Sequence, residues 1–218
     1  MFRKKSVIDV IEKLGFAMML TAVGGFMDAY SYVVRGKVFA TGQTGNFVLV
    51  CVHMMQKDYI QMFHAIVPIV SFWIGVFISC HMLYYFRERQ LLLKHMTLVI
   101  EILLVFIVGL IPCSYPDIIA NTLISFAASL QYCAFRKFST NGNYANIFCT
   151  GNMRSCAENY YKGVVRKDKQ SMKRALGYTC ILISFFIGAA SAAYESKIFH
   201  AKSIWSLDIV LIGILLFL

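Results

Sequence analysis

Apolar residues gather along the chain in long runs that are separated by short polar segments. Six of these runs approach or reach the ~20 residues that an α-helix needs to cross the hydrocarbon core of a bilayer. They are residues 14–34, 59–86, 96–111, 118–135, 175–194 and 203–218. The third and the last are short for this purpose and need flanking residues. The pattern therefore predicts an all-α integral membrane protein with six transmembrane helices.

The composition agrees with this prediction. Hydrophobic residues make up 59% of the chain and charged residues only 15%, and the mean hydropathy is +0.65. These values lie far from those of soluble domains.

One further apolar stretch, VFATGQTGNFVLVCVHMM at residues 38–55, is too short and too glycine-rich at its start to cross a membrane. It contains one of three motifs that return, in the same order, later in the chain. The pairs are GGFMDAYS and ASLQYCAF, QTGNFV and CTGNMR, and SFWIG and SFFIG, which begin at residues 24 and 128, 43 and 149, and 71 and 184. We therefore expect two related halves, residues 1–112 and 113–218, within one membrane domain.

The net charge of +10 comes from Lys and Arg residues that cluster between the apolar runs. Such clusters report membrane orientation, because cytoplasmic loops carry an excess of Lys and Arg, and they do not require a nucleic-acid partner. If both T-G-N segments crossed the membrane, the two faces would share the 21 Lys and Arg residues almost equally. If both segments are re-entrant, six spans remain and most of these residues lie on the side of the N-terminus. We therefore expect a cytoplasmic N-terminus and two re-entrant hairpins.

Three spans in each half is an odd number, so the second half must be inverted relative to the first, as in many transporters. The first hairpin would descend as extended chain over residues 37–42, turn at T-G-N and return as a helix over residues 46–57. The second would run from about residue 140 to residue 161. The predicted fold is thus two inverted three-helix repeats, each with a re-entrant half-helix hairpin.

The two T-G-N turns would place two helix N-termini near the middle of the membrane. Thr and Asn are favourable N-caps, Gly permits a tight turn, and helix N-termini carry unpaired N–H groups with a partial positive charge. Such a pair of termini suits a small anionic or polar solute. Alternatively, the motifs only cap two short helices in a packed interior. The candidate binding residues are Asp28, Gln43, Thr44, Gly45, Asn46, Gln131, Thr150, Gly151 and Asn152.

Three acidic residues fall within predicted spans, where an isolated charge costs at least ~2.5 kcal/mol. Asp28 could carry a coupling proton or cation, or it could cap a neighbouring half-helix. Glu101 is the second candidate for ion coupling, although Glu101 and Asp208 could also lie near an interface without a function. Gln131 and Tyr132 occupy the second-half positions of Met27 and Asp28, so the acid is not duplicated.

At these residues the chain resembles the YoaK family of bacterial membrane proteins. The resemblance is carried by Gly25-Phe26-Met27-Asp28-Ala29 and Thr44-Gly45-Asn46 in the first half, and by Thr150-Gly151-Asn152 in the second. The segment Ser129-Leu130-Gln131-Tyr132-Cys133 departs from the G-x-Q-N-A pattern of the family. The resemblance implies a multi-spanning protein of the bacterial plasma membrane and supplies no activity.

The leading functional hypothesis is a small secondary transporter or channel, active alone or as a homodimer in the lipid bilayer. The alternative is a non-transporting scaffold whose basic loop, residues 162–174, binds anionic headgroups or a protein partner. Arg35 and Lys37 are expected at the outer mouth, where they would attract anions or extend to the interface. We find no nucleophile–base spacing, no G-x-S-x-G and no Walker loop that would indicate an enzyme. We also find no metal or cofactor motif, and the seven Cys show no C-x-x-C spacing.

Overall fold

The computed structural model describes residues 2–135, 137–139, 142–143 and 146–218, and these residues are almost entirely helical. The elements in chain order are α1 (Phe2–Val34), α2 (Gln43–Met55), α3 (Tyr59–Tyr85), α4 (Gln90–Leu110), α5 (Asp117–Ala134), β1 (Lys137–Ser139), β2 (Gly142–Asn143), α6 (Thr150–Val165), α7 (Lys169–Phe199), the 3₁₀ helix η1 (His200–Ile204) and α8 (Trp205–Phe217). The two short strands pair antiparallel.

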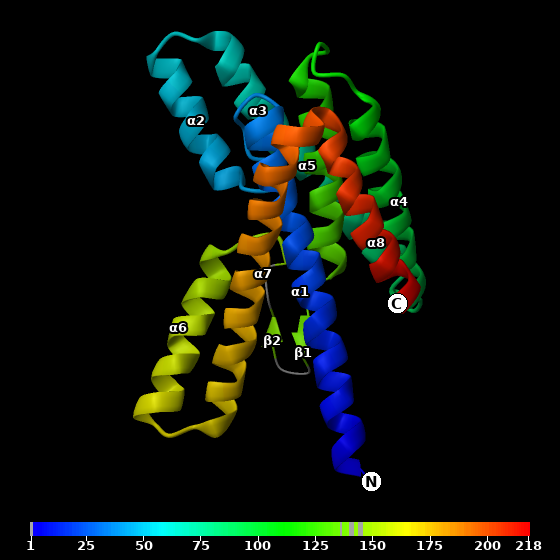
Figure 1. Ribbon diagram of the computed structural model, residues 1–218, viewed down its shortest axis with the longest axis vertical. Coiled ribbons are helices and arrows are strands. Elements are labelled where there is room, and N and C mark those ends of the chain that lie inside the picture. The colour runs from blue at the N-terminus through cyan, green and yellow to red at the C-terminus, as the bar shows by residue number, and fades with distance from the viewer. Residues whose placement is uncertain (1, 136, 140–141, 144–145) are drawn as a thin grey trace.

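α1 and α7 lie side by side at the centre of the molecule and form its most extensive helix pair (Figure 1). Glycine permits this approach, because a Cβ atom on Gly25 would collide with the backbone carbonyl of Phe185. A Cβ atom on Gly188 would in turn collide with the carbonyl of Ala22. Small residues at such a contact let two helix backbones pack closely, which is a principal source of attraction between helices in lipid.

α3 and α5 form the second extensive pair, and Gly75 of α3 lies directly against Ser129 of α5. α4 packs on both α5 and α8. At the start of α8, the Trp205 ring stacks on Phe106 of α4 with centroids 5.8 Å apart, and it covers Gly109. Each of the two extensive pairs thus joins the two halves of the chain. α1 of the first half packs on α7 of the second, and α5 of the second half packs on α3 of the first.

Four segments are long and apolar enough to cross a membrane: Leu14–Val34, Tyr59–Tyr85, Gln90–Leu110 and Lys169–Phe217. The last of these contains both α7 and α8, and the chain reverses between them at η1 (Figure 1). α5 coincides with a predicted span but falls outside these four, because buried polar residues are interspersed along it. The protein is therefore an all-α membrane protein, and the count of six spans stays a prediction.

α2 and α6 begin near the middle of the molecule and run toward opposite ends (Figure 1). Their 13 and 16 residues correspond to lengths of about 20 and 24 Å, less than a ~30 Å hydrocarbon core. Both are therefore too short to cross a bilayer as they stand. The predicted entry of the second hairpin, near residue 140, lies outside the described residues.

The T-G-N motifs lie in the first turn of each helix and are not the turns themselves. The N-cap positions are Gly42 and Cys149, and within the described residues neither helix start has a side-chain cap from its N-cap residue. The prediction that Thr and Asn of T-G-N act as N-caps is therefore wrong. The chain instead turns earlier, over residues 35–42, where Gly36 and Lys37 have positive φ. The turn lies there because side chains outside it, described below, form hydrogen bonds with its backbone.

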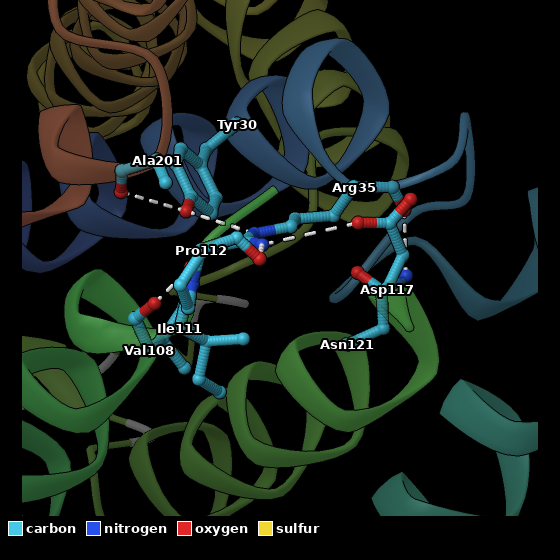
Figure 2. A network of polar contacts seen from close by, with 8 residues as sticks. All are labelled: Tyr30, Arg35, Val108, Ile111, Pro112, Asp117, Asn121 and Ala201. Carbon is cyan, nitrogen blue, oxygen red and sulfur yellow. Dashed lines mark hydrogen bonds and ion pairs between the residues drawn. The ribbon is translucent and has the colours of Figure 1, made fainter. Parts of the chain in front are cut away.

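Arg35 has a different place from the one that the sequence suggested. Its side chain is fully buried and its Nη2 donates hydrogen bonds to the carbonyl oxygens of Val108 (3.1 Å) and Ile111 (2.6 Å) at the end of α4, as Figure 2 shows. Its Nε donates to the Tyr30 hydroxyl (3.0 Å), and the Asp117 carboxylate lies 3.9 Å from Nη1. Carbonyl groups at a helix C-terminus lack intrahelical partners, so a buried cation satisfies them. Arg35 therefore joins α1, α4 and α5, and the expectation that it lies at an open outer mouth is wrong.

Candidate solute site

Asp28 on α1 fixes the loop that leads into α2. Its Oδ1 accepts hydrogen bonds from the backbone N–H groups of Thr41 (2.7 Å) and Gly42 (3.1 Å). These N–H groups immediately precede α2. The carboxylate on α1 thus caps the segment that leads into α2. The capping role that we considered for Asp28 is thus present in the structure. Its role in ion coupling stays a prediction.

Asn46 closes the same loop from the other side. Its Oδ1 accepts a hydrogen bond from the N–H of Phe39 (2.9 Å), and its Nδ2 donates to the carbonyl of Phe39 (2.6 Å) and to Oε1 of Gln43 (2.9 Å). The Phe39 ring stacks on Tyr32 and covers Gly45, where a Cβ atom would lie 2.8 Å from the ring. Asn46 is fully buried, so it acts on the backbone of the loop.

Buried amides hold the second loop in a related way. Nδ2 of Asn152 donates to the carbonyl of Phe148 (2.9 Å), as Asn46 does to a phenylalanine carbonyl. Nδ2 of Asn146 donates to the carbonyl of Gln131 (3.0 Å), and Nε2 of Gln131 donates to the carbonyl of Leu20 (3.0 Å). Asn146 and Asn152 thereby hold the segment before α6 by hydrogen bonds to backbone carbonyls, and Gln131 joins α5 to α1.

The two loops meet directly, because the Thr41 hydroxyl donates to the carbonyl of Ile147 (3.2 Å). Beside this junction, between the starts of α2 and α6, lies a pocket of about 550 Å³. Its lining comprises Asp28, Phe39, Gly42, Gln43, Thr44, Gly45, Tyr132, Ile147, Phe148, Cys149, Thr150, Gly151 and Phe185. A cavity of this size can hold a small organic solute.

The pocket brings together six of the nine candidate binding residues: Asp28, Gln43, Thr44, Gly45, Thr150 and Gly151. The other three, Asn46, Asn152 and Gln131, are buried beside it and bond to backbone as described above. Glu101 lies on α4, which contributes no residue to the lining of this pocket. Both T-G-N motifs thus reach one site through their Thr and Gly residues and support it through their Asn residues.

The aromatic part of the lining was not expected from the sequence. Tyr132, Phe148 and Phe72 form one cluster in which the rings of Tyr132 and Phe148 lie 5.1 Å apart. Apolar residues inside apolar runs carry no mark that separates a pocket wall from core. Tyr132 is an exception, because the comparison of the two halves places it at the second-half position of Asp28.

The chemical groups around the pocket are of three kinds. The first turns of two helices contribute backbone N–H groups with partial positive charge, and Thr44 and Thr150 contribute exposed hydroxyls. Asp28 contributes a carboxylate, and the aromatic rings contribute apolar walls. Such a mixture of apolar walls and a few directed polar groups is typical of small-molecule sites.

The fold defines a multi-pass, all-α membrane protein, and a pocket lies between two of its helix starts. The chain belongs to the family described as "Protein of unknown function (DUF1275)", whose model matches residues 16–217. It is similar to the UPF0700 transmembrane protein YoaK of Bacillus subtilis (strain 168), with 23% identity over 205 residues that cover 91% of this chain and 90% of that protein. The resemblance to the YoaK family is thereby confirmed. No solved structure matches the chain.

Proposed function

We propose that this protein is a small secondary transporter or channel, and that its solute binds in the pocket between the starts of α2 and α6. The observation that carries the proposal is that two T-G-N motifs, separated by about half the chain, contribute Thr and Gly residues to one pocket. The start of each helix carries partial positive charge. At α2 the N–H groups of Gln43 and Gly45 already donate to the carbonyls of Thr41 and Gly42 (2.9 Å each), so among the described first-turn groups of this helix the Thr44 N–H is the one proposed to bind a ligand.

The Asp28 carboxylate narrows the class of solute. A simple anion would be attracted by the two helix starts and repelled by this carboxylate, whereas a polar solute with both donor and acceptor groups would be attracted by each. The apolar rings of Phe39, Phe148 and Phe185 favour a solute with some apolar surface. We therefore propose a small polar or zwitterionic solute ahead of an inorganic anion.

The helix pairing supports an inverted repeat of the two halves. α1, the first helix of the first half, packs on α7, the third helix of the second half. Equivalently, α5, the first helix of the second half, packs on α3, the third helix of the first half. The repeated motifs lie at equivalent contacts, since Gly188 of SFFIG meets α1 and Gly75 of SFWIG meets α5. Inverted repeats with broken helices at their interface are a recurrent architecture of secondary transporters.

We further propose six spans in the bacterial plasma membrane, with the N-terminus and the loop between α6 and α7 in the cytoplasm. The first-half helix α2 contains no Lys, Arg, Asp or Glu residue, as a segment inside the bilayer requires. α6 instead carries an exposed ion pair between Arg154 and Glu158, with Nε and Oε1 2.7 Å apart. This exposed ion pair supports a position of α6 in contact with water or headgroups.

A single glycine offers a test that leaves the fold in place. Gly151 lines the pocket, and among the described residues nothing lies within 4 Å of a Cβ atom built there. Gly151→Leu should therefore add bulk at the pocket wall, with a Cβ atom that meets no described neighbour. Gly213 of α8 is equally open and lies outside the pocket lining, so Gly213→Leu is the matched control.

The experiment measures the melting temperature of the purified protein in the presence of each member of a panel of amino acids, carboxylates, sugars, nucleobases and inorganic anions. A compound at ~100 times its dissociation constant should stabilise the protein by about 2.7 kcal/mol. We expect this shift in the wild type and in Gly213→Leu, and its loss in Gly151→Leu. Liposome flux of the same compound then separates transport from binding alone.

Two outcomes would contradict the proposal. A shift that persists in Gly151→Leu would place the ligand elsewhere. The absence of any shift, combined with binding of the wild type to vesicles of anionic lipid through residues 162–174, would favour the scaffold function.

A further inference from the structure

Two carboxyl groups lie buried between α4 and α8, away from the pocket. Glu101 of α4 is fully buried and Asp208 of α8 is 8% exposed. The two helices that carry them pack against each other, and the charge of Asp208 acts on Glu101. Within the described part of the chain, none of their four carboxyl oxygens has a hydrogen-bond partner. Neither α4 nor α8 contributes a residue to the pocket lining.

Charged groups on the elements packed around these helices have other partners. Arg35 of α1 binds the carbonyls at the end of α4, as described above, together with Asp117 of α5. Lys202 of η1 lies over the Trp205 ring, with Nζ 5.8 Å from its centroid. Glu195 of α7 accepts a hydrogen bond from the hydroxyl of Ser206 in α8. None of these described groups neutralises Glu101 or Asp208.

An ionised carboxylate without a partner in such surroundings is strongly unfavourable, and two adjacent carboxylates repel each other as well. Protonation removes both costs, because a neutral carboxyl group has no charge to desolvate and none to repel its neighbour. A divalent cation fits less well, since Ca²⁺ takes six to eight oxygen ligands. Among the described residues there is no group of three or more His, Cys, Asp or Glu side chains that could hold a metal ion.

We infer that Glu101 and Asp208 form a proton-binding site between α4 and α8, in which protonation neutralises the buried carboxyl groups. The site goes beyond the proposed solute pocket and does not depend on it. Its ligand is a proton, and its two acids come from the two halves of the chain.

Infrared spectroscopy of the protein in lipid nanodiscs tests this site directly, because a neutral carboxyl group and a carboxylate absorb at different frequencies. The wild type is compared at neutral pH with the double variant Glu101→Gln/Asp208→Asn. The control is Glu195→Gln, which changes a nearby carboxyl group with a different partner. We expect the double variant to lose the neutral-carboxyl absorption of this site and the control to retain it.

A single variant gives an independent answer if the double variant does not fold. Two interacting acids titrate as a coupled pair, so removal of one must change the titration of the other. In Asp208→Asn the pH at which the neutral-carboxyl absorption disappears should therefore differ from that of the wild type. An unchanged absorption in the double variant, or titration curves of Asp208→Asn and wild type that superimpose, would overturn the inference.

One consequence rests on the proposed function. If the pocket carries a solute, this proton site is placed to couple solute movement to a proton gradient. Addition of the solute to proteoliposomes should then change the internal pH for the wild type, and the double variant should exchange solute without this change. Absence of flux would refute transport and leave the infrared result intact, so the two failures are distinguishable.

Discussion

Asp28→Asn tests whether a charged carboxylate organises the loop in front of α2. The substitution keeps the shape and the accepting oxygen and removes the charge. Oδ1 of Asp28 accepts two backbone hydrogen bonds, at 2.7 and 3.1 Å. A hydrogen bond to a charged group contributes about 1.5–3 kcal/mol and one between neutral groups about 0.5–1.5 kcal/mol. The difference of about 1–1.5 kcal/mol for each bond predicts a loss of about 2–3 kcal/mol in the free energy of unfolding.

The assay is reversible denaturant unfolding of the purified protein in mixed detergent micelles. Asp58→Asn is the matched control, because Asp58 caps α3 through one exposed bond to the N–H of Gln61 (3.1 Å). Asn and Asp are equally good at such a cap, so the control should change stability by only a few tenths of a kcal/mol. A cost for Asp28→Asn as small as that of the control would refute a charged Asp28 as the holder of this loop.

Three further predictions concern topology, helix packing and pH. Lys57 and Lys167 occupy exposed loops at opposite ends of the molecule. Cysteines introduced at these two positions should react with a membrane-impermeant reagent from opposite sides of the membrane. Labelling of both from the same side would contradict the six-span arrangement. Gly188→Ala should destabilise the protein by about 1–3 kcal/mol or more, because the added methyl group collides with the α1 backbone, and an unchanged melting temperature would show that α1 and α7 pack differently. The Ser171 hydroxyl, together with a backbone N–H group, lowers the pKa of Asp168 at the start of α7. Because the pKa is lowered, the stability that this cap contributes is present above the pKa of unfolded Asp and is lost as the pH falls through the pKa of the folded state. The melting temperatures of the wild type and of Asp168→Ala should therefore differ at neutral pH and converge in acid.

The long helices were predictable from the sequence because their signal is local. The apolar run at residues 59–86 corresponds to α3 (Tyr59–Tyr85), and the run at 118–135 to α5 (Asp117–Ala134). Where polar residues continue a helix, the apolar pattern misplaces its start. α4 begins at Gln90 although the apolar run begins at residue 96, and α1 begins at Phe2 although its run begins at residue 14.

The site was predictable only in part, because its contacts join residues far apart in the chain. The T-G-N motifs led to the correct pair of helix starts. The turn before α2 could not be placed, since it depends on Asp28 of α1 and on the bond from Asn46 back to Phe39. For the same reason the sequence indicates Glu101 and Asp208 only as separate acids, and their burial on two packed helices follows only from the folded chain.

Cys149 provides the most direct test of the central claim, that a solute binds between the two helix starts. This free thiol lines the pocket and is partly exposed, whereas Cys113 is exposed outside the lining. Alkylation by a small permeant reagent, followed residue by residue by mass spectrometry, is measured in the presence of each compound of the panel. We predict that one class of polar solute slows alkylation of Cys149 and leaves that of Cys113 unchanged. Reaction of Cys149 at the same rate with every compound present would contradict a solute site at this pocket.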